Sequence, residues 1–134
     1  MSAKILVVDD NPTNLKLVSD VLAYEGHDIL KAVDAEEAQV VLAGTLPDLI
    51  LMDIALPGMD GLTLTRKLKA DERTRHVRIV ALTAFAMKGD DQKALGAGCD
   101  GYITKPIDTR KFPVQVAAFL EDSHAKPNES ANRK

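Results

Sequence analysis

Five polar side chains capable of chemistry each follow a short apolar run in this chain of 134 residues. They are the carboxylates of Asp9, Asp10 and Asp53, the hydroxyl of Thr83 and the ammonium group of Lys105. Ligands bind at the carboxyl ends of strands in an open α/β sheet, so these groups would share one edge if the runs are parallel strands. One aspartate alone is often only a loop or helix-capping residue, whereas the whole set indicates a functional site.

The three carboxylates would need a cation in order to lie close together. Two carboxylates about 4 Å apart repel by roughly 4 kcal/mol at an effective dielectric of about 20. Hard oxygen ligands suit Mg²⁺, which keeps several waters and shares phosphate oxygens, and Lys105 and Thr83 would help to orient a phosphoryl group. Asp53 stands alone after the central apolar run, so it is the expected nucleophile that forms an acyl phosphate, and Asp9 and Asp10 would hold the metal.

The elements that must position this set alternate along the chain. The apolar runs are β-branched and nearly unbroken, which is typical of strands covered on both faces, and they predict strands at 5–8, 48–52, 77–82 and 101–104, with another at 27–32. Helical patterns separate them: helices are predicted from the cap Asn11 to Gly26, from the cap Asp34 to Gly44, around Leu62–Leu68, at 90–97, and after the cap Asp108, with Pro113 in the first turn. This alternation predicts an α/β fold with a parallel sheet.

The composition is that of an ordinary globular protein of one domain. Apolar residues make up 46% and charged residues 28%, and the single cysteine excludes an intramolecular disulfide. The net charge of −3 disfavours nucleic acid and anionic membranes as partners. No apolar run reaches the ~18 residues that span a bilayer and no signal peptide is predicted, so we expect a cytoplasmic protein. We expect a folded domain over residues 1–122 and a mobile polar tail over 123–134.

Several other residues have simpler interpretations. Cys99 is expected to be a small packed residue, and the three histidines have no metal-ligand spacing. Arg66, Lys67 and Lys69 are expected to form a solvated helix face. Residues 57–61 are expected to form a turn and a helix start.

Taken together, the motifs resemble the receiver domain of bacterial response regulators, the CheY-like family. The matching pieces, which span residues 4 to 121, are Ile-Leu-Val-Val-Asp9-Asp10, Asp48-Leu-Ile-Leu-Met-Asp53-Ile-Ala-Leu-Pro57-Gly-Met-Asp60-Gly61, Val80-Ala-Leu-Thr83-Ala84 and Gly101-Tyr102-Ile-Thr-Lys105-Pro106. Residues 83–90 and 98–103 are further similar to stand-alone regulators of the DivK type and to receivers of hybrid kinases. The resemblance implies a doubly wound sheet of five parallel strands in the order 2-1-3-4-5, with five helices.

The resemblance also implies a role for each site residue. Asp53 matches the phosphoacceptor and Asp10 the direct ligand of Mg²⁺, while Asp9 matches a residue that binds the ion through water or helps to place it. The backbone carbonyl of Ala55 matches the third protein ligand.

Three further positions match the family's switch. Thr83 matches the switch hydroxyl, and Lys105 matches the lysine that pairs with the phosphoryl group. Tyr102 matches the aromatic side chain that turns inward when Thr83 moves, and the bond between Lys105 and Pro106 matches the family's cis peptide.

The function that the resemblance implies is a phosphorylation-switched signalling module rather than a turnover enzyme. A histidine kinase or a histidine phosphotransfer protein would phosphorylate Asp53, and the surface of the fourth helix, fifth strand and fifth helix would then control a downstream protein. No DNA-binding output, nucleic-acid partner or membrane partner is expected, and the chain should be a monomer or a weak dimer.

Two other classes of protein use related folds. A phosphatase of the haloacid-dehalogenase type has a second aspartate two residues after the nucleophile, where this chain has Ala55. A flavodoxin-like flavin binder has serine, threonine and glycine donors after the first strand, where this chain has Asp9, Asp10 and Asn11. Both differences favour the receiver.

Overall fold

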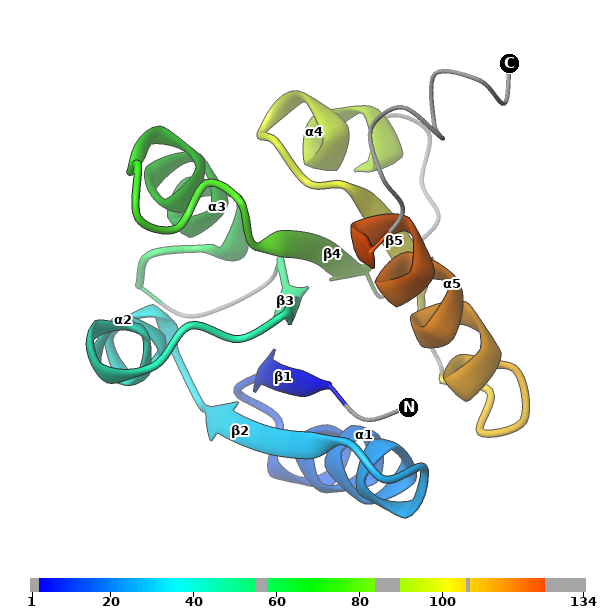
Figure 1. Ribbon diagram of the computed structural model, residues 1–134. Coiled ribbons are helices and arrows are strands. Elements are labelled where there is room, and N and C mark those ends of the chain that lie inside the picture. Colours follow the sequence, from blue (N-terminus) through cyan, green and yellow to red (C-terminus); the bar gives the residue numbers. More distant parts are fainter. Residues whose placement is uncertain (1–2, 55–57, 84–89, 106, 125–134) are drawn as a thin grey trace.

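The computed structural model describes residues 3–54, 58–83, 90–105 and 107–124, with residues 83, 90–92 and 121–124 described by their backbone alone. Strands and helices alternate along the chain (Figure 1). The strands are β1 (Lys4–Val8), β2 (Asp28–Ala32), β3 (Leu49–Asp53), β4 (Arg78–Thr83) and β5 (Gly101–Thr104). The helices are α1 (Pro12–Tyr24), α2 (Ala35–Gly44), α3 (Gly61–Ala70), α4 (Asp90–Gly96) and α5 (Phe112–His124).

The five strands form one parallel sheet in the order β2-β1-β3-β4-β5. This confirms the expected α/β class, and it confirms the strand order that the family resemblance implied. Strand β1 pairs with β2 on one side and with β3 on the other. After β2 the chain crosses back past β1 and adds the remaining strands on its other side, so the switch point of the sheet lies between β1 and β3. Such a switch point opens a crevice at the carboxyl ends of the two strands.

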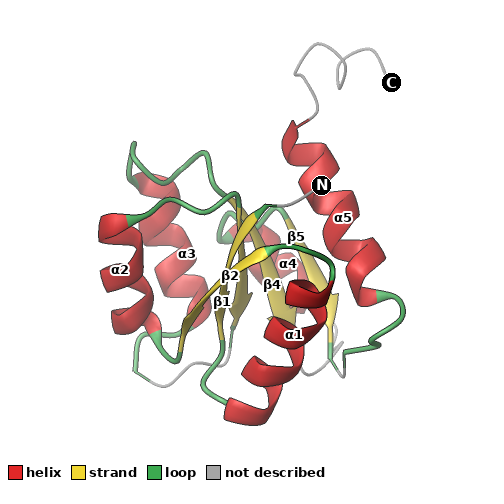
Figure 2. Ribbon diagram, turned by 60° about the horizontal axis from the view of Figure 1, so that its bottom comes forward, coloured by secondary structure: helices red, strands yellow, loops and turns green. Residues whose placement is uncertain are grey.

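Alternate side chains of each central strand enter two separate cores. Leu6, Val8 and Met52 pack on the face covered by α2 and α3, whereas Val7 and Leu51 pack on the face covered by α1 and α5. Figure 2 shows these two pairs of helices on opposite sides of the sheet. Burial on both faces explains why the strands read as unbroken apolar runs. Among the helices that the structure describes, none is both long and apolar enough to cross a membrane.

Two helices begin at capping residues that the sequence predicted. Asn11 accepts a hydrogen bond from the backbone N–H of Asn14, with Pro12 in the first turn of α1. Asp34 does the same for α2. Asp60, which was expected only to belong to a turn and helix start, caps α3 in the same way. Each cap satisfies a backbone donor that would otherwise have no partner at the start of the helix, so the loops that carry the polar site residues end at fixed points.

The predicted start of the last helix at Asp108 was wrong. The Asp108 carboxylate accepts from the backbone N–H groups of Arg110 and Lys111 in a separate turn, and α5 begins at Phe112. A helix starting at residue 109 would need an N–H at Pro113, which proline lacks, whereas proline is tolerated in the first turn. Smaller differences are that α4 ends at Gly96 and that α5 continues to His124, two residues past the expected domain end.

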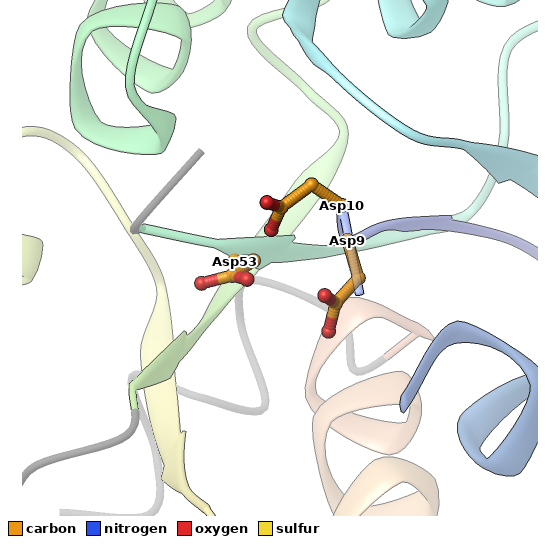
Figure 3. A group of neighbouring side chains, drawn as sticks. All are labelled: Asp9, Asp10 and Asp53. Carbon is orange, nitrogen blue, oxygen red and sulfur yellow. The ribbon is translucent and has the colours of Figure 1, made fainter. Parts of the chain in front are cut away.

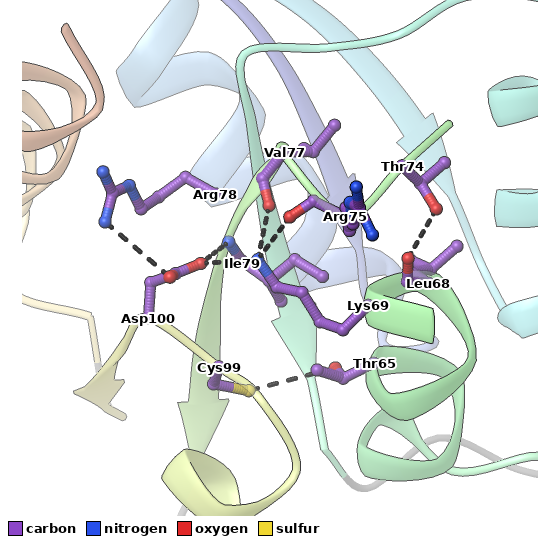
Figure 4. Close-up of polar contacts among 10 residues, drawn as sticks. All are labelled: Thr65, Leu68, Lys69, Thr74, Arg75, Val77, Arg78, Ile79, Cys99 and Asp100. Carbon is purple, nitrogen blue, oxygen red and sulfur yellow. Dashed lines mark hydrogen bonds and ion pairs between the residues drawn. The ribbon is translucent and has the colours of Figure 1, made fainter. Parts of the chain in front are cut away.

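The prediction of a solvated basic face on α3 was wrong for Lys69. Arg66 and Lys67 are exposed, but the Nζ atom of Lys69 lies 2.9 Å from the carbonyl oxygen of Val77 and 3.1 Å from Oδ2 of Asp100 (Figure 4). The same Asp100 oxygen accepts the backbone N–H of Ile79. These contacts tie the end of α3 to the starts of β4 and β5.

Cys99 is packed in the core beside the Lys69 contacts, as expected. It is buried, and its Sγ atom lies 3.9 Å from Oγ1 of Thr65 (Figure 4). Burial raises the pKa of the thiol, which therefore stays protonated and unreactive at neutral pH.

Candidate phosphoryl and metal site

Three carboxylates meet at the carboxyl edge of β1 and β3 (Figure 3). Val8 of β1 is in register with Met52 of β3, so both strands deliver an aspartate, Asp9 or Asp53, at the same level. One carboxylate oxygen from each of Asp9, Asp10 and Asp53 lies within 4.8 Å of the others. The structure therefore brings together the three acidic residues that the sequence singled out.

Asp9 is the most enclosed of the three and is held by several donors. Its side chain is fully buried, whereas Asp10 is exposed. The backbone N–H of Asn11 donates to Oδ1 of Asp9 over 2.9 Å, and the Nδ2 group of Asn14 donates to Oδ2 over 2.8 Å. A buried carboxylate requires such donors, because removing it from water is otherwise strongly unfavourable.

Lys105 bridges two of the carboxylates. Its Nζ atom lies 3.3 Å from Oδ2 of Asp9 and 3.2 Å from Oδ2 of Asp53. The lysine follows β5 and so reaches across β4 to the aspartate at the end of β3. Both partners are nearly inaccessible to water, which makes this ion pair much less screened than one at the surface.

The donor set fits a small divalent cation. Three carboxylates and one ammonium group leave a net charge of about −2, which one divalent ion would neutralise. All the available ligand atoms are hard oxygens, and the exposed carboxylate of Asp10 leaves one side of the cluster open to water. This combination suits Mg²⁺, which is usually bound through one or two carboxylates and retains water ligands.

The remaining predicted site residues are placed less completely. Thr83 ends β4 with its backbone in register with Thr104, but its side chain lies outside the described atoms. Tyr102 lies on the edge strand β5 with 41% of its surface exposed, outside the acidic cluster. Ala55 and Pro106 lie outside the described residues, as do Phe85 and Ala86, which follow Thr83 in the sequence.

Two residues that shape the site were not predicted from the sequence. Asn14 orients Asp9 through a hydrogen bond from its side-chain amide. The available signal was its position three residues after the cap Asn11, which places Asn14 in the first turn of the helix, near Asp9. Gly61 begins α3 so close to β3 that a Cβ atom there would lie 2.3 Å from the backbone oxygen of Asp53. The glycine lay inside the segment 57–61, which was interpreted only as a turn and helix start, and in its described part Asp60 caps α3 and Gly61 begins the helix.

A five-stranded parallel sheet with an acidic cluster and a lysine at its carboxyl edge defines an α/β domain of the doubly wound type with a candidate cation site. The sequence model of the response regulator receiver domain matches residues 5–117. The chain therefore belongs to the response regulator receiver family, whose members act in two-component signalling.

Individual relatives agree with this assignment. The chain is 40% identical over 123 residues to the polar-differentiation response regulator DivK of Brucella ovis, covering 92% of this chain and 100% of the relative. It also resembles the receiver domain of a sensor histidine kinase from Pseudomonas aeruginosa, which was solved with magnesium in its active-site cleft. The identity is 32% and the TM-score 0.80, and the match covers 93% of this chain and 100% of that receiver domain. The chemotaxis regulator CheY4 of Vibrio cholerae, at 24% identity, shares the fold with a TM-score of 0.83 over 89% and 99%.

Proposed function

We propose that this chain is a phosphorelay receiver in which Asp53 accepts a phosphoryl group from a phosphohistidine. The donor would be a histidine kinase or a histidine phosphotransfer protein. The observation that carries the proposal is the convergence of Asp9, Asp10 and Asp53 within 4.8 Å, with the ammonium group of Lys105 about equally distant from two of them.

The transfer exchanges one bond to phosphorus for another. A carboxylate oxygen of Asp53 attacks the phosphorus atom, and the bond between phosphorus and the donor imidazole nitrogen breaks. The imidazole nitrogen keeps the electron pair of that bond and takes up a proton, and Asp53 becomes an acyl phosphate. Water attack at the same phosphorus atom would release inorganic phosphate and restore the carboxylate.

The residues around Asp53 favour this transfer by position and charge. Asp10 and Asp53, together with the backbone carbonyl of Ala55, would hold Mg²⁺, and Asp9 would help to place it. The bound ion supplies positive charge beside the phosphoryl oxygens. Lys105 supplies a second cation within reach of the same oxygens, since its Nζ atom already contacts Asp53.

The output would be a conformational state rather than a released product. The acyl phosphate would attract Lys105 and the hydroxyl of Thr83, and Tyr102 would then turn inward from its exposed position. This change would alter the surface formed by α4, β5 and α5, which exposes the apolar side chains of Leu95, Tyr102 and Val114. A downstream protein would recognise that surface in the cytoplasm, with the regulator acting as a monomer or weak dimer and without nucleic acid or membrane.

Phosphoryl labelling tests the proposal directly. A histidine kinase panel labelled on its phosphohistidine is mixed with the chain and Mg²⁺ for short times. We expect labelling of the unmodified chain by at least one donor and no labelling of Asp53→Asn. Asp20→Asn, an exposed aspartate on α1, should be labelled normally. Undiminished labelling of Asp53→Asn would refute the assignment, as would rapid turnover of small phosphomonoesters, which would indicate a phosphatase.

A further inference from the structure

Oδ2 of the buried Asp9 accepts hydrogen bonds from two donors, one neutral and one charged. The neutral amide of Asn14 donates to it over 2.8 Å, and the Lys105 ammonium lies 3.3 Å from it. The Asp9 side chain has no exposed surface, so water is not available to replace either donor. The two donors also differ in mobility. Asn14 lies in the first turn of α1 and is fixed by it. The Nζ atom of Lys105, in contrast, is at the end of a long flexible side chain.

Asn14 is held in place by the start of the helix. Its backbone N–H donates over 3.1 Å to the side chain of the cap Asn11, and the half-buried amide then projects toward Asp9. The backbone N–H of Asn11 occupies the other Asp9 oxygen over 2.9 Å. The first turn of α1 therefore supplies one fixed donor to each oxygen of Asp9, independently of Lys105.

We propose that Asn14 is a positioning residue that keeps Asp9 hydrogen-bonded when Lys105 moves to the phosphoryl group. The inference depends on the proposed function, because it concerns the movement of Lys105 toward an acyl phosphate on Asp53. A buried acceptor that loses its donor pays the full desolvation penalty, so a site without Asn14 would hold Lys105 on Asp9. Asn14 carries no charge, and it therefore supports Asp9 without weakening the attraction of the cluster for a divalent cation.

Binding of beryllofluoride, a phosphoryl analogue that joins a carboxylate in the presence of Mg²⁺, separates this role from others. The affinities for Mg²⁺ alone and for beryllofluoride at saturating Mg²⁺ are measured by amide chemical shifts for the wild type and for two variants. Asn14→Leu removes the donor at similar volume, and Asn14→Ala removes it with a smaller side chain, and neither variant adds a charge beside Asp9. We expect both variants to bind beryllofluoride about tenfold more weakly, with Mg²⁺ binding unchanged or tighter.

The controls distinguish positioning from loss of stability. Val18→Ala creates a cavity in the buried face of the same helix. Its affinity for beryllofluoride is compared with that of the Asn14 variants under conditions where the free energies of unfolding are equal. This variant should bind beryllofluoride as the wild type does, because it touches none of the donors of Asp9. Asn14→Leu and Asn14→Ala differ in volume but both lack the donor, so equal losses of affinity for beryllofluoride in the two variants indicate the lost hydrogen bond rather than altered packing.

The outcomes separate the inference from the proposed function. If the wild type does not bind beryllofluoride, the proposed function fails and the inference fails with it. If the wild type binds and both Asn14 variants bind equally well, only the inference is overturned. It is overturned as well if the variants lose affinity for Mg²⁺ and beryllofluoride by the same factor, because Asn14 would then act on the metal alone.

Discussion

The close approach of α3 to the end of β3 predicts a measurable effect of Gly61→Ala. A Cβ atom at Gly61 would lie 2.3 Å from the backbone oxygen of Asp53 and 2.8 Å from Cα of Ile54, whereas ordinary contact begins at 3.4 Å. Both neighbours are backbone atoms, so no flexible side chain can move aside. The start of α3 and the segment carrying Asp53 must therefore separate by about 1 Å.

The size of the effect follows from two opposing contributions. Forcing a methyl group into a packed site costs about 1–3 kcal/mol. Alanine is favoured over glycine in a helix by up to about 1 kcal/mol, which offsets part of that loss. We expect Gly61→Ala to lower the free energy of unfolding by about 1–2 kcal/mol, which corresponds to a fall in Tm of roughly 4–8 °C for a domain of this size.

Urea denaturation followed by circular dichroism measures this loss, and the chain offers a matched control. Gly44 ends α2, and a Cβ atom there would meet nothing within 4 Å. Gly44→Ala should therefore leave stability unchanged or raise it by up to about 1 kcal/mol. Because Gly61→Ala displaces Asp53, it should also weaken Mg²⁺ binding. The reasoning is refuted if Gly61→Ala unfolds at the same urea concentration as the wild type.

Two further predictions concern residues outside the phosphoryl site. Lys69→Met should lower the free energy of unfolding by about 1–2 kcal/mol in urea denaturation, because Asp100 and two carbonyl oxygens lose a charged donor. As a control, Lys67→Met at the exposed neighbouring lysine should change the free energy of unfolding by less than about 0.5 kcal/mol. Burial lowers the pKa of His27, whose Nδ1 accepts the backbone N–H of Ala3. The unfolded chain therefore binds this proton more readily, and stability should be complete above about pH 6.5 and fall as the pH drops through the lower folded pKa. A histidine NMR titration giving His27 a pKa of 6.5 or more would contradict this.

The alternation of strands and helices could be predicted because each element leaves a local periodic signal. The unbroken apolar runs reflect burial on both faces of the sheet, and the predicted caps Asn11 and Asp34 stand where helices begin. The strand order has no such signal, because periodicity does not encode which strands are neighbours. That order was available only through the family resemblance.

The acidic cluster could also be predicted, because its position depends on a general property of parallel sheets. Asp9 and Asp53 follow strands in register, so their convergence needs no knowledge of side-chain contacts. The surrounding contacts were not predictable in this way. Lys69 reaches Asp100, which lies 31 residues further along the chain, and the partner of Asn14 depends on how the first turn of α1 faces β1.

The charges of the site explain why Lys105 should be the mobile element of the proposed switch. Three carboxylates, one lysine and a divalent ion together carry a net charge near zero. Phosphorylation would convert the single negative charge of Asp53 into about two on the phosphoryl oxygens, so the attraction for Lys105 increases on Asp53 and not on Asp9. The lysine already lies between these two acceptors, at 3.2 and 3.3 Å, and a small difference in charge is enough to favour one of them. The fixed donors on Asp9 are then what allow the lysine to leave it.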